Sequence, residues 1–359
     1  MMMDGPAYCP GDPGKFEMIG GENMGRSFRV AMIGCGRRGR KHALGLKADS
    51  RCEVVALVDI KRDVAEEFKK DFEFDAAIYE DYKEMLKKEK PDIVTVCLWT
   101  ELHLPIVRDC AEAGVKAILC EKPMAPTWGE SLEYDRIVKQ TGCQLTFGHQ
   151  RRFAEGNLLV RKWIKEGLFG KILRMDLYSP RHLLDCGTHT FDQALSFNDE
   201  IPAKWVIGAV DISETISYFD VKAEIMAAGH LVFQNGVRAN IQVGGPDMDM
   251  WGGVRVVGSE GFIEVFWDGN FGKACLYNDP TWQPPEVDSG DRIQMEGLIR
   301  NAVDALETGV EPELSYKKAL RAAEIIFAFY ESARLHRRIE LPLEGVEGNP
   351  LYMMLDSQN

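Results

Sequence analysis

The chain has 359 residues, of which 45% are hydrophobic and 28% charged, and its formal net charge is −13. This length and balance are typical of a globular protein with two domains. The scattered excess of acids argues against a nucleic-acid partner or an anionic membrane surface. No apolar run approaches the ~18 residues of a membrane span. The nine cysteines include no C-x-x-C pair, so we expect reduced thiols and a cytoplasmic protein.

The sequence divides into four segments. Residues 1–27 are rich in Gly, Pro and Met and lack the features of a signal peptide, so we interpret them as an irregular N-terminal extension. Strand and helix patterns alternate over residues 28–149, which predicts a doubly wound parallel sheet. Residues 150–343 are expected to form a second α/β domain, and residues 344–359 a C-terminal tail.

A glycine-rich turn opens the first domain. The apolar run Val30–Ile33 leads into Gly34-x-Gly36-x-x-Gly39, which predicts a strand, a tight turn and a helix. Gly34 would allow the turn, Gly36 would let the backbone approach a pyrophosphate, and Gly39 would let the helix pack on the strand. The pyrophosphate would then lie at the helix N-terminus. The alternative is a glycine-rich turn without a ligand.

An acid follows at the end of the second predicted strand. Asp59 lies twenty residues after Gly39, where a dinucleotide-binding fold places a carboxylate on the ribose hydroxyls of NAD. Its charge should repel the 2′-phosphate of NADP. Arg37 and Arg38 lie in the turn, close enough to soften that preference, so NAD is the expected cofactor and NADP stays possible.

The remaining elements of the first domain follow from apolar periodicity and caps. We expect helices at 63–70, 81–88, about 103–113 and 127–141, and strands at 76–79, 93–98, 115–120 and 144–147. Thr127-x-x-Glu130 is a capping box for the last helix.

The pattern changes beyond residue 151. After one helix at about 155–166, strands dominate, and Asn235-Gly236 predicts a type I′ hairpin turn within an antiparallel sheet. Helical stripes at 298–306 and 319–330 could cover the apolar face of this sheet. A face left open would be a natural interface for a homodimer or homotetramer.

Side chains suited to chemistry follow the strands of the parallel sheet. Strand 115–120 ends in Glu121-Lys122-Pro123, at the sheet edge where ligands bind. Lys122 could hydrogen-bond a substrate hydroxyl and stabilise a developing alkoxide, or it could be a surface lysine. Trp99, Thr100 and His103 follow the strand at 93–98 and could form a wall for the adenine or nicotinamide. Simple loop packing is the alternative for these three.

A second cluster lies between residues 182 and 192. Asp185 and His189 are four residues apart and share a face if the segment is helical, so the carboxylate could orient an imidazole that exchanges protons. Asp185 as a helix cap, His189 as a core histidine, and a metal trio with His182 are the alternatives. No fourth ligand lies nearby, so no metal is expected. At the domain junction, at most one of Arg151 and Arg152 faces the cleft; we assign substrate binding to Arg152, with interdomain ion pairing as the alternative.

Together these motifs resemble the glucose–fructose oxidoreductase, inositol dehydrogenase and rhizopine catabolism (Gfo/Idh/MocA) family. The resemblance runs from Phe28 to about Pro342. It rests on the glycine turn, Cys120-Glu121-Lys122-Pro123, Asp185-x-Gly187-x-His189-x-x-Asp192, Gly258-Ser259-Glu260-Gly261, Ala328–Ala333 and Ile339–Pro342.

The resemblance implies a Rossmann domain joined to an α/β domain with a large, mostly antiparallel open sheet, often assembled into dimers or tetramers. It also implies NAD(P)-dependent oxidation or reduction of sugars and polyols. By position, Lys122 would polarise the reacting hydroxyl, His189 would be the acid/base, and Asp185 would bind substrate or orient His189. Glu121 would lie near the nicotinamide.

One departure concerns the loop before this cluster. Many members carry a longer glycine-rich loop there, whereas residues 178–184 are short, and Arg181 and His182 could occupy the vacated space and contact substrate. The sequence therefore predicts an NAD-preferring dehydrogenase or reductase of a sugar, cyclic polyol or sugar derivative. An NAD-dependent glycoside hydrolase and a silent dinucleotide-binding regulator are the alternatives.

Overall fold

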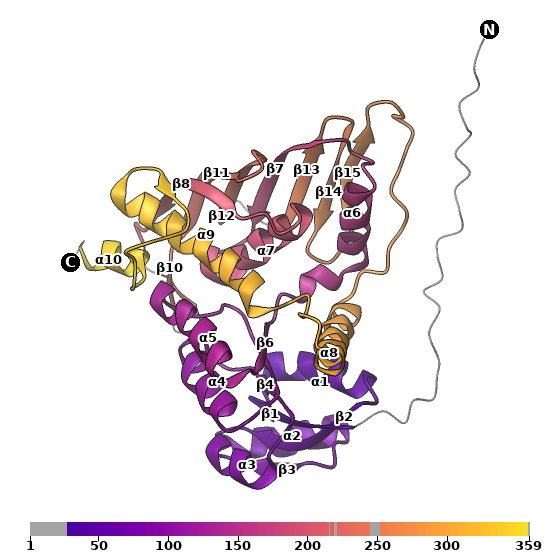
Figure 1. Ribbon diagram of the computed structural model, residues 1–359, viewed down its shortest axis with the longest axis vertical. Coiled ribbons are helices and arrows are strands. Elements are labelled where there is room, and N and C mark those ends of the chain that lie inside the picture. Colours follow the sequence, from indigo (N-terminus) through magenta and orange to yellow (C-terminus); the bar gives the residue numbers. More distant parts are fainter. Residues whose placement is uncertain (1–26, 215, 219–220, 245–251, 358–359) are drawn as a thin grey trace.

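The computed structural model describes residues 27–214, 216–218, 221–244 and 252–357. The extension expected at residues 1–27 therefore lies outside the described residues except for Ser27. Figure 1 shows a parallel sheet with flanking helices in its lower half and a larger sheet in its upper half. Within the described ranges, no helix is long and apolar enough to cross a membrane.

The lower half holds a six-stranded parallel sheet with the order β3-β2-β1-β4-β5-β6. This is the doubly wound arrangement that the alternating pattern predicts. Strands β4 and β5 are buried at every residue, because helices cover both of their faces. The strands are β1 (Phe28–Ile33), β2 (Cys52–Val58), β3 (Ala77–Tyr79), β4 (Ile93–Val96), β5 (Ala117–Cys120) and β6 (Gln144–Phe147).

Five helices connect these strands. They are α1 (Arg37–Ala48), α2 (Arg62–Phe72), α3 (Tyr82–Glu89), α4 (His103–Glu112) and α5 (Trp128–Thr141). The capping box forms as expected at α5, where the Thr127 hydroxyl accepts the Glu130 N–H at 3.2 Å. Gly142 ends that helix with a φ of 72°.

The upper half is built on an eight-stranded sheet with the order β15-β14-β13-β7-β12-β11-β8-β16. All neighbouring pairs are antiparallel except β12 and β7. The predicted turn at Asn235-Gly236 joins β11 to β12, with Gly236 at a φ of 86°. The strands are β7 (Ile172–Ser179), β8 (Ala203–Asp211), β11 (Met226–Phe233), β12 (Arg238–Gly244), β13 (Gly253–Gly258), β14 (Gly261–Phe266), β15 (Phe271–Leu276) and β16 (Ile339–Glu340); β9 (Ile216–Tyr218) and β10 (Val221–Ala223) pair separately.

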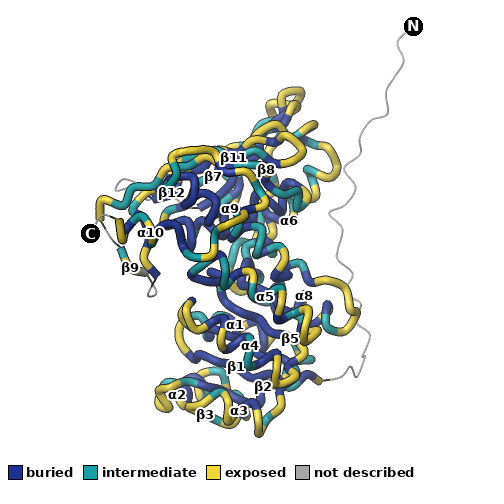
Figure 2. Tube along the Cα trace, turned by 60° about the vertical axis from the view of Figure 1, so that its left-hand side comes forward, coloured by how far each residue is buried: buried dark blue, intermediate teal, exposed yellow. Residues whose placement is uncertain are grey.

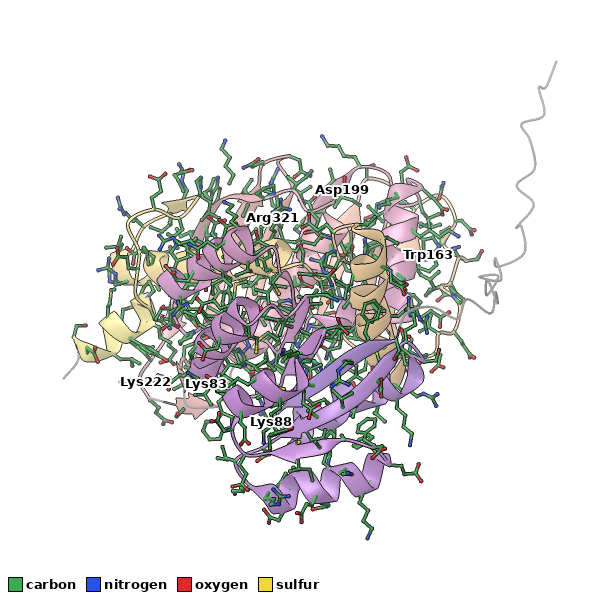
Figure 3. The ribbon with its side chains drawn as sticks, turned by 60° about the horizontal axis from the view of Figure 1, so that its bottom comes forward. Lys83, Lys88, Trp163, Asp199, Lys222 and Arg321 are labelled. Atoms are coloured by element: carbon green, nitrogen blue, oxygen red, sulfur yellow. The ribbon has the colours of Figure 1, made fainter. Side chains whose placement is uncertain are left out.

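Helices cover one face of the large sheet. Helices α7 (Thr188–Phe197) and α9 (Tyr316–Leu335) lie on the face that looks toward the parallel sheet, and α6 (Glu155–Lys165) packs near β14. Figure 2 shows buried chain in the centre of both halves and exposed chain at their rims. Charged residues such as Lys88, Asp199 and Lys222 are exposed to solvent (Figure 3).

Helix α8 (Asp291–Thr308) does not cover the large sheet, so the expectation for its apolar stripe is wrong. Met295, Leu298 and Ile299 belong to the buried cluster around β1 and α1 of the lower half. The fit is close, because a Cβ at Gly45 of α1 would lie 2.5 Å from the Met295 carbonyl oxygen. An amphipathic stripe shows that one face is buried, but it does not show which element covers that face.

The described part of the predicted C-terminal tail is folded rather than loose. Helix α10 (Pro350–Asp356) buries Leu351 and Leu355 completely or nearly so. Asn349 caps α10 and also donates from its side chain to the Pro126 carbonyl at 2.9 Å. This segment therefore ties the end of the chain to the loop before α5.

Candidate active site

The three glycines of the turn have three different environments. Gly34 has a φ of 97°, which favours glycine, and a Cβ there would lie 2.5 Å from the Cys97 carbonyl oxygen. A Cβ at Gly39 would lie 2.2 Å from the Gly34 carbonyl oxygen, so the start of α1 packs tightly on the turn. Gly36 has nothing within 4 Å of its Cβ position. The open space at Gly36, at the N-terminus of α1, fits a pyrophosphate.

Asp59 lies at the end of β2 beside this turn. Its carboxylate accepts the backbone N–H groups of Cys35 and Lys61, each at 3.0 Å. These bonds fix the side chain but use only part of its acceptor capacity, since a carboxylate has about four lone-pair sites. Asp59 is partly exposed, so the remaining sites can accept ribose hydroxyls. The residues present therefore fit a dinucleotide.

A cavity of about 270 Å³ lies between the carboxyl edge of the parallel sheet and α7. It is the place where open α/β sheets bind their ligands. Of the predicted site residues, the cavity is lined by Gly36, Arg37, Arg38, Trp99, Thr100, Glu121, Lys122, Asp185 and His189. The structure therefore brings the phosphate turn and the proposed chemical groups into one space.

Lys122 and Asp185 form an ion pair across this cavity. Lys122 follows β5, and its Nζ lies 2.7 Å from Oδ1 of Asp185 and 2.8 Å from the Asp185 carbonyl oxygen. Both side chains are nearly nine-tenths buried, at 12% and 11% exposure. The carboxylate thus positions the ammonium group at the end of the sheet, and Lys122 is not a free surface lysine.

Asp185 owes its position to a π-helical turn over Leu183–Gly187, directly before α7. Buried Glu224, at the end of β10, accepts the Leu183 N–H at 2.6 Å and the Tyr330 hydroxyl at 2.8 Å. These contacts hold the start of the turn against α9. The widened turn directs Asp185 to Lys122, whereas the i, i+4 pattern predicts a pairing of Asp185 with His189.

His189 lies at the first turn of α7 and is 4% exposed. Its Nδ1 is buried without a hydrogen-bond partner among the described residues. The ring lies 5.6 Å from the Trp267 indole and 5.6 Å from the His149 ring, measured between centroids. Burial first, then the nearby Lys122 and Arg151 charges, holds the pKa of His189 well below its usual value. His189 is therefore neutral near pH 7 and can accept a proton.

Glu121 is a buried residue of the cavity lining and is held by two groups from α1. Arg38 donates to both Glu121 oxygens at 2.8 and 3.0 Å, and His42 Nε2 lies 2.9 Å from Oε1. Although burial opposes the charged forms, the contacts with Cys97 and Glu121 raise the pKa of His42 to about 10. The Arg38 charge likewise holds the pKa of Glu121 well below its usual value. This cluster links the phosphate turn to the strand that carries Lys122.

Among the predicted site residues that do not line the cavity, His103 and Arg152 make structural contacts instead. His103 is fully buried, with its ring nitrogens 3.0 Å from the Pro123 and 3.1 Å from the Leu98 carbonyl oxygens, so it braces two loops instead of forming a cofactor wall. Arg152 is 1% exposed and forms ion pairs with Asp192, Glu200 and Glu313. The assignment of substrate binding to Arg152 is therefore wrong, and ion pairing explains this residue.

Arg181 and His182 do not fill the main cavity either. Arg181 is exposed and lies outside its lining. His182 is 7% exposed and its Nδ1 lies 2.8 Å from the Glu224 carbonyl oxygen. It lines a separate hollow of about 10 Å³ beside Asp185. Within the described ranges, no group of three or more His, Cys, Asp or Glu side chains is arranged to hold a metal ion.

Two further cavity residues are Arg151, which was weighed against Arg152 from the sequence, and Trp267, which was not singled out. Arg151 lines the cavity with its guanidinium 5.6 Å from the centroid of the Trp267 ring. Trp267 comes from the end of β14 and donates its indole N–H to the Thr190 hydroxyl at 3.2 Å. The pair of adjacent arginines indicated that one of them could face the cleft. The residues around Trp267 in the sequence give no such indication.

A six-stranded doubly wound sheet with a glycine turn at its carboxyl edge is the arrangement of a dinucleotide-binding domain. Residues 28–149 match the family model described as "Oxidoreductase family, NAD-binding Rossmann fold". The match confirms the expected resemblance over these residues, together with the NAD-binding Rossmann fold.

Two curated relatives are similar to this chain. Myo-inositol 2-dehydrogenase of Thermotoga maritima is 29% identical over 207 residues, which cover 53% of this chain and 60% of the relative. D-glucoside 3-dehydrogenase of Escherichia coli is 30% identical over 161 residues, covering 45% of this chain and 44% of the relative. The chain thus spans about half the length of these relatives.

A solved structure has the same fold over most of the chain. The WlbA dehydrogenase from Bordetella pertussis, crystallised with NADH and UDP-GlcNAcA, has a TM-score of 0.75 at 20% identity. The match covers 89% of this chain and 99% of that one. It therefore extends the shared fold to the second, large sheet.

Proposed function

We propose that this protein is an NAD-dependent oxidoreductase that acts on a CH–OH group of a sugar, a cyclic polyol or a sugar derivative. The observation that carries the proposal is the Lys122–Asp185 pair, at 2.7 Å, in the cavity that also holds the open Gly36 turn and His189. The relatives named above as sugar and polyol dehydrogenases support this choice.

NAD, when bound, supplies a nicotinamide ring that accepts a hydride at C4 and can return it. Gly36 and the first N–H groups of α1 would hold its pyrophosphate, and Asp59 its ribose hydroxyls. The Asp59 carboxylate would repel the 2′-phosphate of NADP, which NAD lacks. We therefore expect Asp59 to favour NAD.

The proton of the reacting hydroxyl passes to this chain's own side chains. The Lys122 ammonium donates a hydrogen bond to the substrate oxygen and stabilises the negative charge that grows there as the hydride leaves. A ring nitrogen of neutral His189 takes the proton, and gives it back in the reductive direction. Asp185 holds the Lys122 side chain in place at the cavity.

Replacement of these two groups tests the proposal. Lys122→Ala and His189→Ala should each lower kcat/KM by ~10²-fold or more, because each removes an interaction made with the reacting oxygen. NADH formation is followed at 340 nm on a panel of sugars, inositols and sugar acids. Fluorescence titration with NADH should show cofactor affinity within ~3-fold of the wild type.

Arg292→Gln provides the control, since Arg292 is exposed on α8 and pairs with Glu296 on the same helix. Near-normal turnover in both active-site variants would sink the proposal. Tightly retained cofactor with product formed and no net NADH would instead point to the glycoside hydrolase, and no turnover of any substrate to the regulator. No observation on the described residues favours either alternative.

We also propose that the protein is a cytoplasmic homo-oligomer assembled through the large sheet. The eight described cysteines are all free thiols, as a reducing compartment requires. Leu173, Ile207 and Met226 lie on strands of the large sheet with 46%, 45% and 38% of their surface exposed. Light scattering that finds monomer alone at micromolar concentration would contradict the interface.

A further inference from the structure

We propose that the substrate carries a carboxylate, and that Arg151 binds it against the Trp267 indole. The inference rests on the proposed oxidoreductase function and narrows its substrate class to sugar acids, meaning polyols with an ionised carboxyl group. It follows from the pairing of the cavity's charged side chains and from the position of Arg151.

Arg151 is a cavity arginine with weak partners. Its side chain is 23% exposed, and its Nε is buried without a hydrogen-bond partner among the described residues. The contacts of Nη1 are long, at 3.5 Å to Gln294 and 3.9 Å to Asp291. Asp291 is itself bound by Lys41 at 2.8 Å. A half-buried guanidinium in this state retains donors for an anion.

The other cations of the cavity are occupied or belong to the turn. Arg38 is bonded to both oxygens of Glu121, and Lys122 to Asp185. Arg37 lies in the phosphate turn, where a pyrophosphate would use its charge. Thus four cationic side chains line the cavity against two carboxylates, and each carboxylate already has a partner. Arg151 is the cation left for the substrate.

Trp267 places Arg151 beside the reacting groups. The guanidinium carbon of Arg151 and the ring of His189 each lie 5.6 Å from the Trp267 ring centroid. The indole is held on one side by its bond to Thr190, and a Cβ at Gly252 would lie 2.0 Å from it, so it cannot shift easily. A substrate that spans the indole would therefore present one end to Arg151 and a hydroxyl to His189.

The single planar guanidinium favours a carboxylate over a phosphate. An arginine fork matches the two oxygens of a carboxylate with two parallel hydrogen bonds. A phosphate monoester carries more charge and a third oxygen, whereas of the other described cations in the lining Arg38 and Lys122 are paired and Arg37 lies at the phosphate turn.

The test uses matched substrates that differ only in the carboxyl group. Glucose and glucuronate, galactose and galacturonate, and mannose and mannuronate are assayed for NADH formation, with glucose 6-phosphate as a phosphate probe. We expect one acid to exceed its neutral partner in kcat/KM by ~10²-fold, the effect of two charge-assisted hydrogen bonds. Arg151→Gln should remove this preference by lowering kcat/KM for the acid ~10²-fold relative to kcat/KM for its neutral partner.

Binding is measured in parallel, so the test does not depend on turnover. Calorimetric titration of the NADH-saturated enzyme should show at least ~10-fold tighter binding of the acid than of its neutral partner, lost in Arg151→Gln and only partly kept in Arg151→Lys. The NADH affinity itself should not change in Arg151→Gln. Arg292→Gln removes an equal charge from the exposed face of α8 and should keep the acid preference.

Each other outcome overturns the inference. Equal binding of acids and neutral sugars, equal losses for both in Arg151→Gln, or tighter binding of glucose 6-phosphate would exclude a carboxylate at Arg151. A fall in NADH affinity would place Arg151 on the cofactor instead. If neutral sugars are oxidised in a Lys122-dependent way while acids are not, the proposed oxidoreductase function stands and this inference alone fails.

Discussion

Arg151 and Arg152 are adjacent in the chain, yet they lie in opposite electrostatic environments. They belong to one 3₁₀ turn (Gln150–Phe153) at the junction of the two halves. Arg152 points into the upper half and is 1% exposed, with its charge matched by Asp192, Glu200 and Glu313. Arg151 lines the cavity, and its one ion pair among the described residues is with Asp291, at 3.9 Å. One residue is structural and the next is available to a ligand.

The structural arginine and the arginine available to a ligand differ more in their ion pairs than in their burial. The Asp192 carboxylate accepts hydrogen bonds from both Nε and Nη2 of Arg152, at 2.8 and 2.7 Å. These two donors are therefore not available to a substrate. The pKa of Glu313 is held at about 2: burial opposes its charge, but Arg152 and Arg161 outweigh burial. In contrast, burial lowers the pKa of Arg151, the mark of a cation without adequate compensation.

The largest expected effect comes from breaking the satisfied arginine. Arg152→Met should lower the free energy of unfolding by about 3–5 kcal/mol, because it leaves Asp192 buried without its partner. Arg151→Met should change that free energy by less than about 1 kcal/mol, since its bonds are long. Urea denaturation followed by circular dichroism measures both. Equal destabilisation by the two substitutions would remove the distinction.

In the glycine turn, Gly39 and Gly36 differ in the same way, because one has a structural role and the other is available to a ligand. We expect smaller effects here. Gly39→Ala should destabilise the protein by about 1–3 kcal/mol, because its Cβ would lie 2.2 Å from the Gly34 carbonyl oxygen. Gly36→Ala should unfold like the wild type but bind NADH ~10-fold more weakly, because the added methyl group enters the space for the pyrophosphate. Thermal unfolding and fluorescence titration separate the two effects. A Gly36→Ala variant with full cofactor affinity would contradict the assignment of this space.

The smallest expected effect is a shift in pH dependence. His189 must be neutral to accept a proton, so kcat/KM for oxidation falls as the pH drops through its pKa, which lies below the usual value. The Arg151 charge contributes to that lowering. Arg151→Gln should therefore move the acid limb of kcat/KM for a neutral substrate to higher pH, by up to ~1 unit. Arg292→Gln should leave the limb in place, and a shift to lower pH in Arg151→Gln would refute the reasoning.

Local sequence signals predicted the first half well. The glycine turn, the capping box at Thr127 and the buried strands are each determined by neighbours within a few residues, and they formed as expected. Arg38 and His42 also carried a signal, because residues four apart on α1 share a face and both can reach Glu121. That contact was not predicted, since the sequence does not show that β5 ends beside α1.

The rest depends on contacts between distant segments. The π-helical turn that aims Asp185 at Lys122 is held by Glu224, about forty residues away in the chain, and no local pattern encodes it. Trp267 reaches the cavity from β14 through the order of the large sheet. Likewise, two consecutive arginines look the same in sequence until the carboxylates around one of them are located in space.

The position of α8 has a consequence for engineering. This helix begins at Asp291, far from the first domain in the sequence. Its residues Met295, Leu298 and Ile299 nevertheless complete the core around α1 and β1. A fragment ending at residue 149 would expose that apolar strip to water and would tend to aggregate. To transfer the cofactor-binding half into another enzyme, residues 28–149 and 291–308 must therefore be transferred together. The substrate-binding half of the other enzyme would then be inserted between these two segments.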